Sequence, residues 1–284
     1  MPYTINRLTR AAFASRGTMA LEQKKINGLL VDHAPGDGQK LLFVHGASAG
    51  SWNWETFLHH FAGLGYDCYA MNLRGHPPNP ELDNLGALSL NDYAADVRGV
   101  IAELGGEPVL IGHSMGGAIA QMVATDTPLK ALVMASSAPV AGVKFQNPPF
   151  NIWFLLHIFK SLPAMIRKKP LKPGFKVSKS AVLNRVEAER QRAVFDKMVP
   201  ESAVAGVEVL KGEVSADLTG SSIPRLVISG TDDHTSVIAM EREIAQQQGA
   251  DLIELQGHGH MFMLEPGWEQ CAEKLHEWFR AKGI

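Results

Sequence analysis

The sequence predicts an α/β fold in which a mostly parallel sheet carries helices on both faces. Two observations support this prediction. Short apolar runs of strand length alternate along the chain with longer segments whose apolar residues recur at helical spacing. The short runs are apolar throughout, which is typical of strands that are buried on both faces. Strands that alternate with helices in this way build parallel sheets.

The N-terminal part of the chain begins this alternation. Turn residues such as Pro35 and Gly36 end the first apolar run, and Asp92 stands near the start of a segment in which Tyr93 and Val97 recur at helical spacing. In chain order we expect a strand over 25–33, a strand over 40–44, a helix over 52–63, a strand over 67–71 and a helix over 90–104.

A segment of different composition divides the remaining elements into two groups. After Pro139 the alternation stops, and prolines, aromatic residues and lysines are frequent up to residue 222. We therefore predict a core of residues 23–139 and 223–284 with a cap inserted over 140–222. Before the cap we expect a strand over 108–111, a helix over 117–124 and a strand over 131–135; after it we expect a strand over 224–229, a helix over 237–248, a strand over 252–255 and a helix over 268–279.

Residues 1–22 are predicted to form an extension outside the core. They contain Arg7, Arg10 and Arg16 but no acidic residue before Glu22. This composition is typical of organelle transit peptides, and it lacks the apolar stretch of a secretory signal. An alternative is that translation starts at Met19. We expect a cytoplasmic protein, and the extension leaves organelle targeting open.

Composition narrows the classes of function. Of 284 residues, 45% are hydrophobic and 20% charged, and a net charge of −2 gives no reason to expect nucleic acid as a partner. No apolar stretch reaches the length of a membrane span. Cys68 and Cys271 are far apart in the sequence, which favours a reducing compartment over a disulfide framework. The histidines lack the spacing of metal ligands, and we predict neither a metal nor a cofactor.

The segment Gly112-His113-Ser114-Met115-Gly116 is the strongest indication of chemistry. It lies between a predicted strand and a predicted helix, where a G-x-S-x-G pattern forms a sharp turn that exposes the serine hydroxyl. Glycine is needed on both sides, because a Cβ there would collide with neighbouring backbone. Ser114 is therefore the predicted nucleophile. The amide of Met115, at the start of the helix, is a predicted donor to the oxyanion of an acyl-transfer reaction.

A serine nucleophile needs a base and a carboxylate that orients the base. Asp232 and Asp233 follow the strand expected over 224–229, and His258 and His260 follow the next strand. These positions fall at the carboxyl edge of a parallel sheet, where ligands bind in such folds. The residues alone leave both pairs open.

Together these motifs resemble the α/β-hydrolase family in its capped, carboxylesterase-like and lipase-like form. The resemblance covers the chain from Leu29 to the C-terminus, except for the insertion. One departure is Asn72, where the family often has an aspartate. Besides the Ser114 turn, the segments that carry the resemblance are His45-Gly46-Ala47, Leu73-Arg74-Gly75-His76, Gly230-Thr231-Asp232-Asp233 and His260-Met261-Phe262-Met263-Leu264-Glu265-Pro266.

The resemblance implies the α/β-hydrolase fold and selects between the open pairs. It favours Asp233 over Asp232 as the acid and His260 over His258 as the base. For the second oxyanion donor it favours the backbone amide that follows His45-Gly46. This is the amide of Ala47, with Ser48 as a lesser alternative, and His45 itself would have a structural role.

The cap is expected to determine specificity. Trp153 and Phe154, in an apolar stretch, are predicted to bind substrate together with Met261, and packing of the cap on the core is the alternative. No acidic residue occurs between Asp126 and Glu187, whereas nine basic residues fall in the cap. This run could attract an anionic substrate or an anionic membrane surface, or it could be a solvated face without a role. The basic residues are Lys144, Lys160, Arg167, Lys168, Lys169, Lys172, Lys176, Lys179 and Arg185.

The function predicted from these observations is hydrolysis of a carboxylic ester through an acyl-enzyme on Ser114. The substrate would be a small-molecule ester with an apolar acyl or ring moiety. A thioesterase, a C–C bond hydrolase or an acyltransferase would use the same residues. A ligand receptor on a hydrolase scaffold is the alternative without catalysis. A serine at this position argues against haloalkane dehalogenase and epoxide hydrolase chemistry, which need a carboxylate there.

Overall fold

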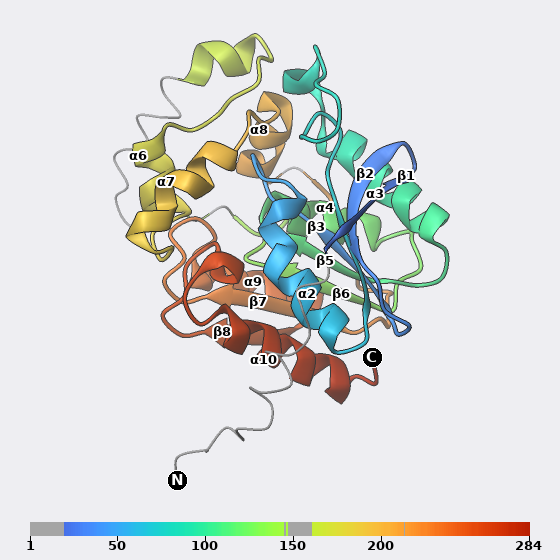
Figure 1. The fold of residues 1–284 in the computed structure, drawn as a ribbon. Helices are drawn as coiled ribbons and strands as arrows, with labels where there is room; N and C mark the ends of the chain where they lie inside the picture. The colour runs from blue at the N-terminus through green and yellow to red at the C-terminus, as the bar shows by residue number, and fades with distance from the viewer. Residues whose placement is uncertain (1–19, 145, 147–160, 213) are drawn as a thin grey trace.

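The sheet forms the centre of the molecule (Figure 1). The structure is a computed structural model, and it describes residues 20–144, 146, 161–212 and 214–284. In this part of the chain an eight-stranded sheet has the order β1-β2-β4-β3-β5-β6-β7-β8. The strands are β1 (Glu22–Ile26), β2 (Leu29–Ala34), β3 (Lys40–Val44), β4 (Asp67–Met71), β5 (Val109–His113), β6 (Ala131–Ala135), β7 (Arg225–Gly230) and β8 (Asp251–Leu255).

Pairing in the sheet is mostly parallel, as predicted. From β4 to β8 every neighbouring pair is parallel, whereas β1 with β2 and β2 with β4 are antiparallel. Strand β5 lies between β3 and β6. The loops that follow these three strands therefore meet at one edge of the sheet.

The strand predicted over 25–33 is wrong in one respect, because this segment is a hairpin. Strands β1 and β2 pair through Ile26 and Leu29. Between them Asn27 and Gly28 adopt positive φ angles of 48° and 77°. Such angles are those of the two-residue turn that asparagine followed by glycine favours between antiparallel strands. Because Asn27 and Gly28 are flanked by apolar residues, one continuous strand was predicted instead of a turn.

Helices cover both faces of the sheet, each over its own apolar cluster. Alternate strand residues divide between the clusters: Leu42 and Val44 face α3, α4 and α9, whereas Leu41 and Phe43 face α2 and α10. Ser89 begins α3 with a capping box to Asp92. The helices are α2 (Glu55–Gly63), α3 (Leu90–Leu104), α4 (Met115–Val123), α9 (Ile238–Gln248) and α10 (Trp268–Ala281), with short 3₁₀ turns at Ser51–Trp54, Leu85–Ala87 and Phe262–Leu264.

The segment between β6 and β7 forms the helices at the upper left of Figure 1. Residues 161–166 are helical, followed by α6 (Phe175–Ala181), α7 (Ala188–Lys197) and α8 (Ala203–Lys211). Helix α8 contacts the Leu85–Ala87 turn, and its Ala205 belongs to the core cluster that α3 and α4 share. The last helix of the insertion is thus packed on the core.

Candidate active site

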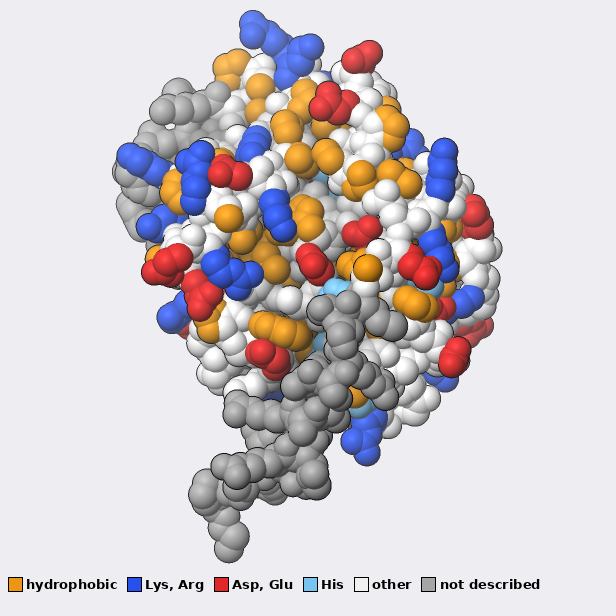
Figure 2. Space-filling view, viewed as in Figure 1, with side chains coloured by type: hydrophobic (Ala, Val, Ile, Leu, Met, Phe, Trp, Pro, Cys, Tyr) orange, Lys and Arg blue, Asp and Glu red, His pale blue; other side chains and the backbone are white. Residues whose placement is uncertain are grey.

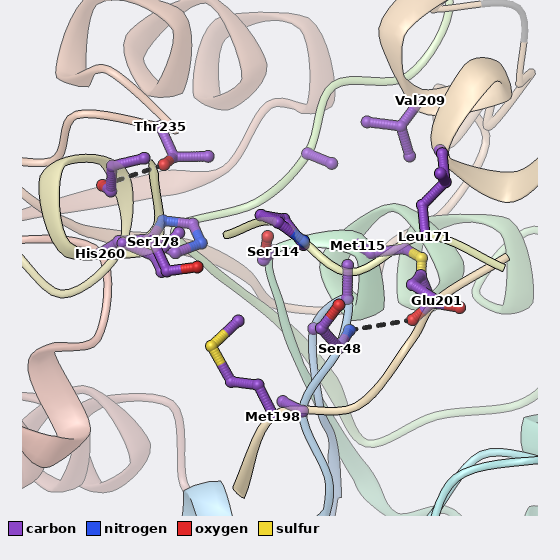
Figure 3. Close-up of a pocket in the computed structure, with 18 of the residues that line it drawn as sticks. Ser48, Ser114, Met115, Leu171, Ser178, Met198, Glu201, Val209, Thr235 and His260 are labelled. Atoms are coloured by element: carbon purple, nitrogen blue, oxygen red, sulfur yellow. Dashed lines mark hydrogen bonds between the residues drawn. The ribbon is translucent and has the colours of Figure 1, made fainter. Parts of the chain in front are cut away.

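Ser114 occupies the sharp turn between β5 and α4. Its φ of 54° and ψ of −120° lie in a region that residues with a side chain rarely adopt. The two flanking glycines permit this turn. A Cβ on Gly112 would lie 2.1 Å from the Gly116 carbonyl oxygen, and one on Gly116 would lie 2.5 Å from the His45 carbonyl oxygen. The backbone therefore holds the Ser114 side chain at the N-terminus of α4, facing the cavity (Figure 3).

His260 and Asp233 form a buried pair beside this turn. The His260 Nδ1–H donates to Asp233 Oδ2 at 2.8 Å, and neither side chain is more than 3% exposed. The other carboxylate oxygen accepts the backbone N–H groups of Thr235 and Ser236, at 2.7 and 2.9 Å. Asp233 is thereby fixed in orientation, and its bond to Nδ1 leaves Nε2 as the ring nitrogen free to accept a proton.

The competing residues of each pair have other partners. Asp232 forms an ion pair with Arg185 of the insertion. His258 Nδ1 lies 3.1 Å from Glu265, which also accepts the Gly259 N–H at 2.9 Å. Glu265 thus holds the loop that carries the histidines. The structure brings His260 and Asp233 together and keeps Asp232 and His258 out of this contact.

His113, which precedes Ser114, fixes the backbone of His260. Its Nε2–H donates to the His260 carbonyl oxygen at 2.9 Å, and the two rings lie 4.6 Å apart. Burial, together with the proximity of His260, holds the pKa of His113 well below its usual value, so the ring is neutral. No role for His113 was predicted from the sequence, although its position inside the G-x-S-x-G motif was a signal.

The two residues predicted to donate to an oxyanion, Met115 and Ala47, both line the cavity beside Ser114. Met115 is the first residue of α4, so its N–H has no acceptor within the helix. Ala47 lies in the loop after β3 and, like Met115, lines the cavity. The Ser48 amide is already used, because it donates to the Glu201 carboxylate at 3.0 Å. This favours Ala47 over Ser48 as the second donor.

His45 is engaged in holding the same loop. Its Nδ1–H donates to the Gly46 carbonyl oxygen at 2.8 Å, and its Nε2 accepts the Leu73 N–H at 3.1 Å. Burial, reinforced by the neighbouring charge of His76, lowers the pKa of His45 to about 3. The ring is neutral and both of its nitrogens are occupied, which leaves no free nitrogen for a base.

Glu201 is a site residue that sequence reasoning missed. It belongs to the insertion, yet its buried carboxylate reaches the loop after β3 (Figure 3). Besides the Ser48 N–H, it accepts the His76 Nε2–H at 3.0 Å, the Tyr93 hydroxyl at 2.7 Å and the Ser202 N–H at 2.7 Å. Four donors therefore converge on one carboxylate between insertion and core.

His76 is the positive partner of Glu201. Its Nδ1 faces the Arg74 carbonyl oxygen at 3.2 Å and its Nε2 faces Glu201, so both nitrogens must donate and the ring is an imidazolium. Burial alone would lower the pKa of His76, but the charge and hydrogen bond of Glu201, together with the backbone carbonyls of Arg74 and Leu73, raise it above its usual value. Burial likewise would raise the pKa of Glu201, but His76, Tyr93 and the Ser202 N–H bring it down to about 2.

The cavity beside Ser114 encloses about 260 Å³ between core and insertion. Its lining is mostly apolar, and among the described lining residues Glu201 is the one carboxylate and no lysine or arginine occurs. Of the predicted substrate-binding residues, Met261 lines this cavity, whereas Trp153 and Phe154 lie outside the described residues. The apolar side chains contributed by the insertion include Met165, Leu171, Val177, Val182, Val209 and Leu210.

No group of three or more His, Cys, Asp or Glu side chains in the described part of the chain is placed to hold a metal ion. None of the described helices combines the length and hydrophobicity that a membrane crossing requires.

Comparison with known proteins places the fold and the motifs in one family. The profile of the "Alpha/beta hydrolase family" matches residues 41–273. The chain is 26% identical over 231 residues to a non-heme haloperoxidase of Rhodococcus erythropolis, covering 74% of this chain and 80% of the relative. It is 28% identical over 222 residues to a pyrethroid hydrolase of Sphingobium wenxiniae, covering 73% and 75%.

The fold is also similar to that of solved structures. A monoacylglycerol lipase of Paleococcus ferrophilus superposes with a TM-score of 0.70 at 22% identity, covering 93% of this chain and 100% of the lipase. At this identity the likeness shows the fold alone. The α/β-hydrolase fold implied by the sequence motifs is confirmed.

Proposed function

The chain belongs to the alpha/beta hydrolase family, and we propose that it is a serine hydrolase that cleaves a carboxylic ester through an acyl-enzyme on Ser114. The observation that carries the proposal is the buried His260–Asp233 pair beside the cavity that Ser114 faces. A nucleophile, a base and an orienting carboxylate, brought together from three loops at one edge of the sheet, are the parts that acyl transfer to serine requires.

Acylation uses the groups in this order. Ser114 Oγ attacks the ester carbonyl carbon while His260 Nε2 takes the hydroxyl proton. The carbonyl oxygen becomes negative and accepts hydrogen bonds from the backbone amides of Met115 and Ala47. The bond to the alcohol oxygen then breaks, and His260 gives its proton to the leaving alcohol. Asp233 keeps the imidazole oriented and stabilises its charged form.

Deacylation repeats the sequence with water. His260 takes a proton from a water molecule, whose oxygen attacks the acyl-enzyme carbonyl. The bond to Ser114 Oγ breaks, the serine regains a proton from His260, and the carboxylic acid leaves. Neither acylation nor deacylation requires a cofactor.

The cavity lining supports an apolar acyl group as the part bound next to Ser114. Aliphatic side chains from the insertion face it, and Glu201, its one described carboxylate, is already paired with His76. No lysine or arginine among the described lining residues offers a partner to an anionic substrate. We therefore favour a neutral ester over the anionic one that the basic run had suggested.

The first test concerns the nucleophile. A fluorophosphonate probe should label the protein at Ser114, and Ser114→Ala should abolish both labelling and turnover. A panel of nitrophenyl esters of graded acyl length, run beside thioesters and a vinylogous diketone, separates ester hydrolysis from the thioesterase and C–C hydrolase alternatives. Turnover retained by Ser114→Ala would exclude the covalent mechanism, and no turnover of any substrate with an unlabelled serine would favour a receptor.

The second test concerns the base and has a matched control in the same loop. His260→Ala should lower kcat by several orders of magnitude, because the nucleophile loses its proton acceptor. His258→Ala removes a ring that contacts Glu265 and should change kcat far less. Equal losses in the two variants would contradict the assignment of the base.

A further inference from the structure

Exposed large hydrophobic side chains are concentrated at one place on the insertion. In the described part of the chain three such residues are exposed: Leu64 at 40%, Leu162 at 49% and Ile166 at 74%. Leu162 and Ile166 lie four residues apart in the helix over 161–166, so they share one face of it. Single exposed hydrophobic residues are common on protein surfaces, whereas these two are neighbours on one helix face.

The other side of this helix faces the cavity. Ser161 and Met165 line the space beside Ser114, and Ser161 is buried. The helix therefore borders the cavity through Ser161 and Met165 and exposes Leu162 and Ile166 to the outside.

Three exposed cations follow the helix directly. Arg167, Lys168 and Lys169 are all exposed, and the backbone holds them close to the helix end. The Lys168 N–H donates to the Met165 carbonyl oxygen at 3.1 Å and the Lys169 N–H to that of Ala164 at 2.9 Å.

This turn is also seated on the core. A Cβ added to Gly86 would lie 2.3 Å from the Lys168 carbonyl oxygen, so the two backbones are in close contact. We call Leu162, Ile166, Arg167, Lys168 and Lys169 the cap-tip patch. Figure 2 shows basic and hydrophobic side chains, with acidic ones beside them, at the top of the molecule, the end at which Figure 1 places this helix.

Charge selects the kind of partner. The sequence has no acidic residue between Asp126 and Glu187, so the patch lies in a segment where no acidic neighbour in the sequence neutralises its cations. Aliphatic side chains bordered by cations match a surface whose outside is anionic and whose inside is apolar. An anionic lipid bilayer has this arrangement, because headgroup phosphates attract lysine and arginine while aliphatic side chains enter the acyl boundary. Nucleic acid would leave Leu162 and Ile166 without apolar contacts.

We propose that the cap-tip patch docks the protein reversibly on an anionic lipid surface. Docking places the helix that borders the cavity against the bilayer, so that an apolar ester dissolved among the lipids has a short path to Ser114. The binding itself does not depend on the catalysis proposed above, and it is tested with a chain that cannot turn over.

The test is co-sedimentation of the full chain carrying Ser114→Ala with lipid vesicles. Vesicles of phosphatidylcholine mixed with phosphatidylglycerol in equal parts should retain the protein, and vesicles of phosphatidylcholine alone should not. Retention should fall as salt rises, since the screening length shrinks from about 10 Å at 0.1 M to about 3 Å at 1 M.

Substitutions within the patch should weaken retention. Replacing Arg167, Lys168 and Lys169 by glutamine should lower the partition coefficient about a hundredfold, because each cation contributes about a fivefold factor. The pair Leu162→Ser and Ile166→Ser should also lower it, by removing the apolar contacts.

The chain offers matched controls for both changes. Leu64→Ser alters the third exposed hydrophobic residue, and the triple change of Lys25, Lys274 and Arg280 to glutamine removes three exposed cations outside the patch. Both controls should bind mixed vesicles nearly as the parent does. Patch and control variants that lose binding equally would overturn the proposal. So would a parent chain that stays in the supernatant, which would leave an acidic protein as the partner to seek.

A second readout uses the active chain. Patch variants should hydrolyse a short soluble nitrophenyl ester at the parent rate, since no patch residue lines the cavity. The same variants should lose turnover of an ester embedded in mixed vesicles. Loss of both activities would indicate a folding defect, and circular dichroism together with the unfolding midpoint of each variant decides that question independently of binding.

Discussion

Replacing Glu201 by glutamine tests whether the insertion holds the loop after β3, which carries the proposed oxyanion donor Ala47. Each carboxylate oxygen accepts one backbone N–H, Ser48 at 3.0 Å and Ser202 at 2.7 Å. A glutamine amide has one oxygen and one NH₂ group, so in either orientation its NH₂ must face one of these N–H groups. The substitution keeps the shape of the side chain but cannot satisfy both donors.

The cost follows from these contacts. A buried donor left unsatisfied costs about 1–3 kcal/mol, and removing one partner of a buried charge pair, here leaving His76 uncompensated, costs about 3–5 kcal/mol. The effects overlap, and we expect Glu201→Gln to lower the free energy of unfolding by about 3–5 kcal/mol. For a chain of this size the unfolding midpoint should fall by roughly 10 °C.

Activity gives the readout that stability alone does not. If the Ser48 contact holds the neighbouring Ala47 amide in place, its loss displaces an oxyanion donor, and kcat should fall by about 10²-fold with KM little changed. The assay is steady-state hydrolysis of a soluble nitrophenyl ester well below the unfolding midpoint of the variant.

Tyr93→Phe is the matched control. It removes a hydroxyl that donates to the same carboxylate at 2.7 Å but leaves the Ser48 and Ser202 contacts intact. It should cost about 1 kcal/mol in stability and leave kcat near the parent value. A Glu201→Gln variant with the parent midpoint and kcat would contradict a role of Glu201 in holding this loop. A loss of kcat in Tyr93→Phe as large as in Glu201→Gln would contradict it as well.

Three further outcomes are expected. Gly116→Ala should abolish activity and destabilise the fold, because its Cβ would lie 2.5 Å from backbone, whereas Gly63→Ala, with nothing within 4 Å, should be neutral or stabilising by up to about 1 kcal/mol; thermal unfolding compares them. Asp233→Asn should lower kcat by about 10³–10⁴-fold, and Asp232→Asn should lower it far less. Steady-state kinetics measures both, and the opposite ranking would show that the acid is misassigned. Because the pKa of Glu201 falls from 4.5 to about 2 on folding, its stabilisation is present above pH 4.5 and lost as pH falls toward 2, so acid titrations of the parent and Glu201→Gln should converge below pH 4.5.

Most of the fold followed from patterns that act locally. Apolar runs gave the parallel strands, because a strand covered on both faces has no polar side to interrupt it. The hairpin at the N-terminal edge was missed for the same reason. Asn27 and Gly28 signal a turn, but they lie inside a run that is otherwise apolar enough to be one strand.

The candidate site was predictable where its parts are loops that follow strands. Ser114, Asp233 and His260 occupy such places, and the sheet edge brings them together. Glu201 was not predictable, because 153 positions separate it from Ser48 and no spacing or composition links the two. Contacts of this kind are set by how the insertion packs on the core, which one sequence does not reveal.

The close joining of residues 199–203 to the core limits where one enzyme's specificity can be grafted onto another. The Val199 N–H donates to the Ser48 carbonyl oxygen at 2.9 Å, and the Ser202 hydroxyl donates to that of Leu88 at 2.5 Å. A chimera that exchanges everything from 140 to 222 would replace the residues that hold the loop after β3 as well as those that line the pocket. Such hybrids should fail in turnover even when the pocket suits the substrate. We therefore expect a functional chimera to exchange residues only up to 198 and to keep the recipient's own residues 199–203.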